Sequence, residues 1–455
     1  MVSRTIIKES SVPEEPSRPA ETTAARRPKK SVLLLVLVLG ALAATGPLSV
    51  DLYLPAFPQI AADLGAPESQ IQLTLTAIMI GLAVGQIIIG PMSDAWGRRR
   101  PLLIGVAAFT LTSFLIVIVP TVEAFIALRF VQGLAGAAGA VISRAIVRDL
   151  FEGDDAARFF SRLMLVVGLA PILAPVLGGQ LLLVGSWHLS FVVLGAAGAV
   201  SFAAILFGMP ESLPAEQRSP ARAGTLARNF GGLLRDRRFM GFTLALSLGF
   251  SVMFAYISSF PFISDAVYGV SPQTFSLLFG LNSIGLVAAT QINGFLIGRV
   301  STERLLMFGL VVAVAGTGGL LLASLFGTPP LWLAIALLFV SVFAQGFVFT
   351  NATTLAITSQ RPSVAGSASA LMGSLQFGLG GTIGALGGVF SAQGTPTMVS
   401  MSAVMALGTV AAVTAFMLGS AKRTAKVADT AAAVAPVAEP ELEVAQAVAA
   451  EPTAR

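Results

Sequence analysis

Long runs without a charged residue constrain this chain more than any other feature of its sequence. They recur from residue 31 to residue 421, and most reach the ~20 residues that an α-helix needs to cross a bilayer. None alternates apolar and polar residues as a barrel strand would. Only 11% of the 455 residues are charged, against roughly 25% in soluble domains. The sequence therefore predicts an all-α membrane protein.

Twelve spans follow from the positions of charges and turns. Eight runs with few or no charges lie at about 31–57, 69–93, 101–120, 122–148, 161–184, 187–209, 239–264 and 272–298. The stretches 305–360 and 362–421 are too long for one helix, and each has a Gly-Thr-Pro turn signal near its middle, so each is predicted to form two. An uncleaved first span explains the amino-terminal region more simply than a signal peptide does.

Lys and Arg residues indicate the orientation. They lie in the loops that follow even-numbered spans and beside the two ends of the chain, whereas the alternate loops carry acidic residues and His188 but no Lys or Arg. Because positively charged loops stay in the cytoplasm, both termini are predicted to be cytoplasmic. The expected location is the cytoplasmic membrane of a bacterium, which the chain crosses many times.

The spans divide into two six-helix bundles, 31–209 and 239–419, predicted to surround a central cavity. A cytoplasmic linker at 210–238 joins them, and the tails 1–30 and 420–455 are predicted to be disordered because their compositions cannot form a core. A weak internal repeat supports this division, since the Ile-Gly-Leu triplet at 80–82 recurs at 284–286. Two related halves are typical of secondary transporters.

Composition excludes several classes of function. The chain has no Cys and one His, so thiol chemistry, Cys-ligated metals and polyhistidine sites are excluded, and no metal or cofactor is expected. The net charge is +5, but the basic residues lie between the spans and not on the face of a soluble domain, which argues against nucleic acid as a partner. No phosphate-binding loop for ATP and no charge ring of a channel is found. We therefore predict a transporter and not an enzyme.

A short loop between the second and third spans carries the first motif, GPMSDAWGRRRPL, at residues 90–102. It resembles the cytoplasmic signature loop of the major facilitator superfamily, although Ala95 stands where a basic residue is usual. Glycine permits a tight turn there, and an acid can cap a facing helix or pair with arginine. The resemblance implies a gate loop made by a set of small and charged residues, Gly90, Asp94, Gly97, Arg98 and Arg99, with Asp149 of the fourth span.

Two further motifs lie in the fourth and fifth spans. Arg129, Gln132 and Gly133 resemble the R-x-x-Q-G signature of the superfamily, which in exporters is associated with proton transfer. The segment GLAPILAPVLGG, residues 168–179, resembles the antiporter signature, with Ala174 in place of a glycine. Prolines remove helical hydrogen bonds and glycines allow close packing, so a bendable and tightly packed helix is predicted. Its expected key residues are Gly168, Pro171, Pro175, Gly178 and Gly179.

Together with VDLYLPAFPQI in the first span and AGSASALMGSLQFGLG near the eleventh, these motifs resemble the Bcr/CflA family of drug:proton antiporters. The resemblance covers about residues 31–420. It implies proton-coupled efflux, by alternating access, of small drug-like molecules such as bicyclomycin- or phenicol-type antibiotics. Proton-coupled import of a small metabolite is the alternative. Protons, the drug and membrane lipid are the expected partners of a monomer.

Proton coupling is predicted to depend on two charges inside the first bundle. Asp51 and Arg129 each lie six or seven residues from the same end of their spans, so both are about 10 Å deep. A charge in hydrocarbon needs an interior partner, and equal depth makes a pairing of these two feasible. The protonation of Asp51 would then respond to Arg129 and to the entry of drug or water. A fixed structural ion pair is the alternative.

The second bundle has only neutral polar residues within its spans, which suits a mostly apolar cavity for amphipathic ligands. Residues of both bundles are predicted to line this substrate cavity: Tyr53, Gln132, Tyr256, Asn282, Asn351 and Gln376. For those of the second bundle, ordinary hydrogen bonds between helices remain the alternative.

Overall fold

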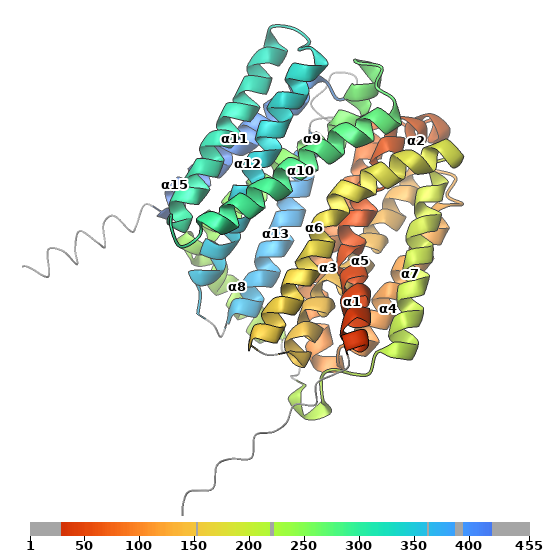
Figure 1. The fold of residues 1–455 in the computed structure, drawn as a ribbon, viewed down its shortest axis with the longest axis vertical. Helices are drawn as coiled ribbons and strands as arrows, with labels where there is room; N and C mark the ends of the chain where they lie inside the picture. Colours follow the sequence, from red (N-terminus) through yellow and green to blue (C-terminus); the bar gives the residue numbers. More distant parts are fainter. Residues whose placement is uncertain (1–28, 152, 219–222, 362–363, 387–394, 421–455) are drawn as a thin grey trace, which may run out of the picture.

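The computed structural model describes residues 29–151, 153–218, 223–361, 364–386 and 395–420, and the predicted tails lie almost wholly outside them. Helices dominate these residues and form two groups that lean against each other (Figure 1). The first group contains α1 (Lys29–Asp51), the 3-10 turn η1 (Leu54–Ala56), α2 (Phe57–Leu64), α3 (Glu68–Trp96), α4 (Arg99–Ile116), α5 (Val122–Leu150), α6 (Gly153–Val184) and α7 (His188–Gly208).

The second group contains α9 (Arg237–Ala266), α10 (Pro272–Leu296), α11 (Thr302–Leu325), α12 (Leu331–Thr358), α13 (Ala365–Gly384) and α15 (Met398–Ser420). Along the chain, the two groups are separated by a 3-10 turn, η2 (Ala215–Gln217), and by α8 (Ala223–Arg235). The linker therefore contains a helix that the sequence analysis did not anticipate. Asn229 and Phe230 attach α8 to the second bundle, through a hydrogen bond to Ser367 and through packing on its core.

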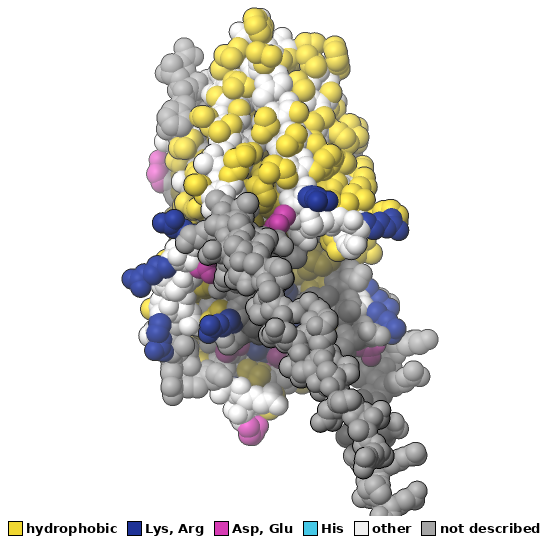
Figure 2. Space-filling model, turned by 90° about the vertical axis from the view of Figure 1, so that its left-hand side faces the viewer, with side chains coloured by type: hydrophobic (Ala, Val, Ile, Leu, Met, Phe, Trp, Pro, Cys, Tyr) yellow, Lys and Arg dark blue, Asp and Glu magenta, His cyan; other side chains and the backbone are white. Residues whose placement is uncertain are grey.

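Within the described residues, eleven helices are long and apolar enough to cross a membrane. The remaining predicted span coincides with α13, which is rich in glycine and serine. Hydrophobic side chains cover the flank of the second bundle, and Lys and Arg side chains lie below them (Figure 2). The prediction of an all-helical membrane protein is confirmed.

We call the end of the bundles at which α1 begins and α15 finishes the terminal end, and the opposite end the far end.

The first span is not the single helix over 31–57 that the sequence predicted. Helix α1 ends at Asp51, and the chain passes through η1 into the short α2. Pro55 and Pro58 have no N–H to donate to the carbonyls four residues before them, so a regular helix does not continue. This break leaves Asp51 at the end of α1, beneath a turn that faces the second bundle.

Glycines bring α3 and α5 together. A Cβ atom added at Gly133 would collide with the backbone carbonyl of Ile78, and one added at Gly81 would collide with the carbonyl of Phe130. In the second half, Gly285 of α10 packs against Phe339 of α12. Gly81 and Gly285 belong to the repeated triplets, so the repeat marks equivalent contacts in the two halves. Small residues let membrane helices approach closely enough to adhere by packing.

The two bundles touch through α3 with α13 and α6 with α10. Met79 of α3 packs on Gly381, and Phe57 lies against Phe262 with ring centroids 5.4 Å apart. Near the far end, the Nε2 group of Gln72 donates to the carbonyl of Ser258 at 3.0 Å. One continuous hydrophobic core crosses this boundary. Residues from both halves therefore share a common interior.

Replacing Gly133 by Ala is expected to lower the stability of the first bundle. The added methyl group meets the backbone of α3, which cannot rotate away as a side chain would, and overpacking of this kind costs about 1–3 kcal/mol. The thermal unfolding midpoint of the purified protein measures the effect. Gly294→Ala is the matched control, because nothing lies within 4 Å of a Cβ there. Equal midpoints for the two variants would contradict the packing argument.

Candidate functional site

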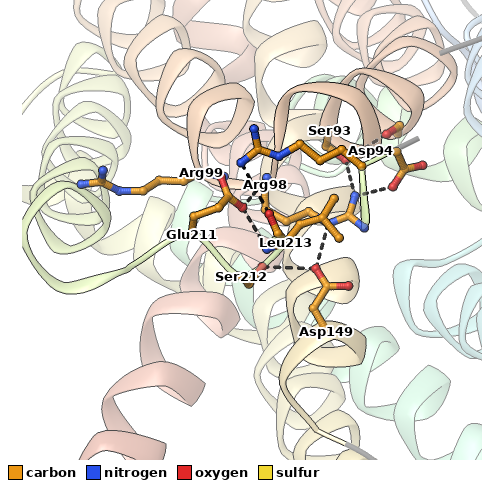
Figure 3. A network of polar contacts seen from close by, with 10 residues as sticks. Ser93, Asp94, Arg98, Arg99, Asp149, Glu211, Ser212 and Leu213 are labelled. Carbon is orange, nitrogen blue, oxygen red and sulfur yellow. Dashed lines mark hydrogen bonds and ion pairs between the residues drawn. The ribbon is translucent and has the colours of Figure 1, made fainter. Parts of the chain in front are cut away.

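Arg98 is the centre of the signature loop at the terminal end (Figure 3). Its Nε donates to Asp149 at 2.9 Å, and its Nη1 reaches both Ser93 and Asp94. Burial alone would lower the pKa of Arg98, but hydrogen bonds to the two carboxylates outweigh it and raise the pKa. This loop therefore fastens the end of α3 to the end of α5. Two roles were predicted for Asp94, capping a helix or pairing with arginine, and the structure shows the pair with Arg98.

Glu211 of the linker completes this network, and the sequence analysis missed it. Its carboxylate accepts hydrogen bonds from the backbone N–H groups of Arg98 at 2.8 Å and Arg99 at 3.2 Å, where α4 begins. The first N–H groups of a helix lack partners within it and attract negative charge. The one feature of the sequence that could have pointed to Glu211 is its position as an acidic residue directly after the sixth span, at the edge of a basic linker.

Partial burial alone would raise the pKa of Glu211. Hydrogen bonds from the backbone N–H groups of Leu213, Arg98 and Arg99, with the nearby charge of Arg218, outweigh it and lower the pKa below its ordinary value of 4.5. Ser212 also donates to Asp149. The linker is therefore attached to the first bundle at its start, while α8 attaches its other part to the second.

The glycines of this loop differ from one another. Gly97 has a φ of +87°, which favours glycine, and a side chain there would meet the Glu211 carboxylate. Gly90 was expected to serve the turn but lies inside α3, where a Cβ has only an ordinary contact with Val141 at 4.0 Å. Arg99 points elsewhere and donates to the carbonyl of Leu206 at 2.6 Å. The turn itself depends on Gly97.

Arg129 lies fully buried inside the first bundle, in a network of neutral partners. Its guanidinium donates to the carbonyl of Ser49 at 2.8 Å and to Gln132 at 2.6 Å, and it lies 4.3 Å from the ring centroid of Tyr53. Gln132 donates onward to Ser113 at 2.7 Å. The network joins α1, α4 and α5, and the arginine is held by packing and hydrogen bonds.

Three of the residues predicted to line the cavity are buried inside a single bundle in the described structure. Tyr53 and Gln132 are completely buried among first-bundle residues, and the Tyr53 hydroxyl bonds to Thr74 at 2.9 Å. Asn351 is also completely buried and donates to Asn293 at 2.6 Å, between α10 and α12. Polar groups inside a bundle find their partners there, and the role of these side chains in a substrate cavity stays a prediction. Gln376 is half-buried.

Asp51 is not paired with Arg129 in the described part of the chain. Its side chain is buried, at 5% exposure, and its carboxylate makes no ion pair or hydrogen bond among the described residues. It lies close enough to Tyr256 of α9 for electrostatic interaction, and Asn282 of α10 donates to the Tyr256 hydroxyl at 2.8 Å. We name Asp51, Tyr256 and Asn282 the junction site, because this electrostatic interaction links Asp51 of the first bundle to a hydrogen-bonded pair of the second.

The antiporter-like segment of α6 packs in two directions. Gly178 faces the carbonyl of Leu52 in the first bundle, and Gly179 faces Ser276 of α10 in the second, with no room for a Cβ at either. Gln273 of α10 donates to the carbonyl of Gly179 at 3.0 Å. Gly168 has nothing within 4 Å of a Cβ and does not contribute to this packing. The close contact is therefore confined to the half of α6 near the far end.

Pro175 creates a hydrogen-bond acceptor for the second bundle. Because proline has no N–H, the carbonyl four residues earlier, that of Pro171, has no helical donor. The hydroxyl of Ser283 in α10 reaches this carbonyl at 3.2 Å and also the carbonyl of Phe279 at 3.0 Å. A hydroxyl has one proton, so the two acceptors share it. Ser283 thus joins the bundles at a bond that α6 cannot make itself.

Comparison with known proteins gives consistent results. The model of the family described as Major Facilitator Superfamily matches residues 37–385. The chain is 41% identical to "Uncharacterized MFS-type transporter YdgK" of Bacillus subtilis, over 84% of this chain and 95% of the relative. It is 34% identical to "Bicyclomycin resistance protein homolog" of Haemophilus influenzae, over 79% and 89%. The nucleoside transporter NupG (D323A mutant) shares the fold, with a TM-score of 0.70 at 17% identity, covering 86% of this chain and 99% of NupG.

Glu211→Gln is expected to weaken the signature loop network. Loss of the charged cap should cost about 0.5–2 kcal/mol at neutral pH, the range for helix caps. The pKa of Glu211 is lowered in the folded protein, so its contribution is full above pH 4.5 and is lost as the pH falls through the lowered pKa. Thermal midpoints of the two proteins should therefore converge in acid. The exposed Glu216, changed to Gln, is the control. A pH-independent difference would contradict this account.

Ser283→Ala is expected to loosen the far end. Removing a hydrogen bond worth about 0.5–1.5 kcal/mol should raise the population opened there by roughly two- to tenfold. The chain has no Cys, so Val270→Cys, at a buried position near the far end, provides a single thiol whose maleimide labelling reports opening. Ser324→Ala is the control, since that hydroxyl bonds only within α11. Unchanged labelling in Ser283→Ala would rule out this role.

Proposed function

The chain belongs to the major facilitator superfamily, and we propose that it exports small drug-like molecules in exchange for protons. It is a multi-pass membrane transporter, and the relative named for bicyclomycin resistance supports drug export. The antiporter-like segment of α6 supports exchange. We include in the proposal that both termini are cytoplasmic, that the membrane is a bacterial cytoplasmic membrane and that a monomer suffices.

The unpaired carboxylate of Asp51 is the observation that carries the proposal. A buried charge without a partner is costly, so such a group responds strongly to any change in its surroundings. Asp51 lies where the bundles join, and rearrangement of the halves changes its surroundings more than those of a residue inside one bundle. A carboxyl in this position can bind a proton in one arrangement and release it in another.

Arg129 has a different part in this proposal from the one the sequence suggested. Its bonds to Ser49 and Gln132 lie inside the first bundle, so the bundle can move as a unit without breaking them. We assign Arg129 to holding the end of α1, and with it Asp51, in place. Drug entering from the cytoplasmic side would meet the junction site and favour release of the proton. Bicyclomycin- or phenicol-type antibiotics are the proposed cargo.

The available drive is adequate for this exchange. One charge crossing 100 mV releases about 2.3 kcal/mol, which supports accumulation of a neutral cargo by tens-fold. Proton-coupled import of a metabolite would use the same drive in the other direction. The direction of net cargo movement under an imposed proton gradient therefore separates export from import.

Asp51→Asn is expected to abolish uphill transport while leaving downhill exchange of the drug. Without the titrating carboxyl no proton is exchanged for cargo, whereas the fold is preserved because Asp51 makes no ion pair in the described structure. Proteoliposomes with an imposed proton gradient and labelled chloramphenicol measure both activities, with and without an uncoupler.

Asp155→Asn, which changes an exposed side chain at the terminal end, is the control for loss of one acid. Uphill export retained by Asp51→Asn would refute the coupling role. Proton-driven uptake of a metabolite, with no drug movement by the native protein, would favour the importer.

A further inference from the structure

A cavity of about 230 Å³ lies between the bundles near the far end. The first bundle contributes Pro55, Pro58, Gln59 and Leu182 to its wall, and the second contributes the remaining residues: Pro261, Ser264, Asp265, Val270, Pro272, Gln273 and Phe275. Four prolines make much of this wall rigid. None of these residues was assigned to the substrate cavity or to the coupling site.

Asp265 is the one charged residue in the wall of this cavity. It is exposed, and its carboxylate has no hydrogen bond or ion pair within the described ranges. Glu68, at the start of α3, lies close enough to interact with it electrostatically. The cavity therefore carries a negative potential with no cation in its wall to offset it.

Two of the other polar groups, Gln273 and Ser264, add acceptors, and none of the others adds positive charge. Gln273 uses its Nε2 group to donate to Gly179, which leaves its Oε1 as an acceptor. Ser264 donates its proton to the carbonyl of Pro261 at 2.9 Å, which leaves oxygen lone pairs. Gln59 is fixed from the other bundle because its Oε1 accepts from the N–H of Trp187 at 3.2 Å. These bonds hold the wall in shape without a bound molecule.

The wall indicates an organic cation and not a metal ion. Divalent metals prefer several oxygen ligands from carboxylates and carbonyls, whereas this wall contains one carboxylate, four prolines and one aromatic residue. Phe275 is also in the wall, and ammonium groups with alkyl substituents suit surroundings of aromatic and apolar side chains beside one negative charge. A wall of mostly apolar residues with a few polar groups and one charge is typical of ligand pockets for small organic molecules.

We propose that this cavity is a binding site for small organic cations, such as quaternary or protonated amines, with Asp265 as the counter-ion. Its wall comes from both bundles, so the site exists only while the far end is closed, where Phe57 meets Phe262. A cation bound there favours this arrangement, because a ligand shifts an equilibrium toward the state that binds it. The site does not depend on the direction of transport.

Isothermal titration of the full-length protein, in nanodiscs of zwitterionic lipid, with tetraethylammonium chloride tests this site. Sodium chloride at equal ionic strength corrects for screening. We expect saturable binding that Asp265→Asn weakens roughly two- to fivefold, as for an exposed ion pair, and that Asp265→Glu largely preserves. Asp155→Asn removes a comparable charge at the terminal end and should not change the affinity. In Val270→Cys, the cation should slow maleimide labelling.

Three results would overturn the proposal. The first is the absence of saturable binding. The second is equal affinity in Asp265→Asn and Asp155→Asn. The third is loss of binding in Asp51→Asn together with full binding in Asp265→Asn, which would place the cation at the junction site. Drug export can fail in proteoliposomes while this binding persists, so the two proposals are tested separately.

Discussion

The need of every backbone amide for a partner inside hydrocarbon is the constraint on which the rest of this structure depends. It makes the spans helical, and it leaves little attraction between helices except close packing and hydrogen bonds. Gly133 and Gly81 make such close packing possible, because they bring α3 and α5 to backbone contact. The position of α5 in turn sets that of Arg129 and of Asp149, so the core of the first bundle and the signature loop both rest on this contact.

The same constraint explains why α6 can meet the second bundle. Proline frees a carbonyl in a place where water is scarce, and a freed group must be satisfied by a neighbour. Ser283 supplies part of that bond from α10, beside the glycine contacts of α6. The acceptor that proline creates is a backbone carbonyl, and the surface that the glycines offer is also backbone. This boundary therefore depends on the backbone of α6 more than on particular side chains of that helix.

Sequence was sufficient for features that depend on local patterns. Uncharged runs predicted the spans, and the spacing of Asp94 and Arg98 suited a local ion pair. Glu211 escaped prediction because it binds backbone N–H groups 112 and 113 residues away along the chain, and backbone donors leave no mark in a sequence. The feasible pairing of Asp51 with Arg129 is not made in the described structure, for a different reason. Counting residues gives depth but not the direction in which each side chain points, nor the end of α1 at Asp51.

The separation of the acid from the arginine clarifies how two charges in one membrane can differ in function. Among the described residues, Arg129 has hydrogen bonds within the first bundle alone, so these bonds persist in any arrangement that moves the bundles as units. Asp51 interacts electrostatically with Tyr256 of the second bundle, and this interaction changes when the halves move apart. In the proposed cycle a titrating group must sense the relative position of the halves. Under the proposal, that requirement favours Asp51 at the boundary over Arg129, which a single bundle encloses.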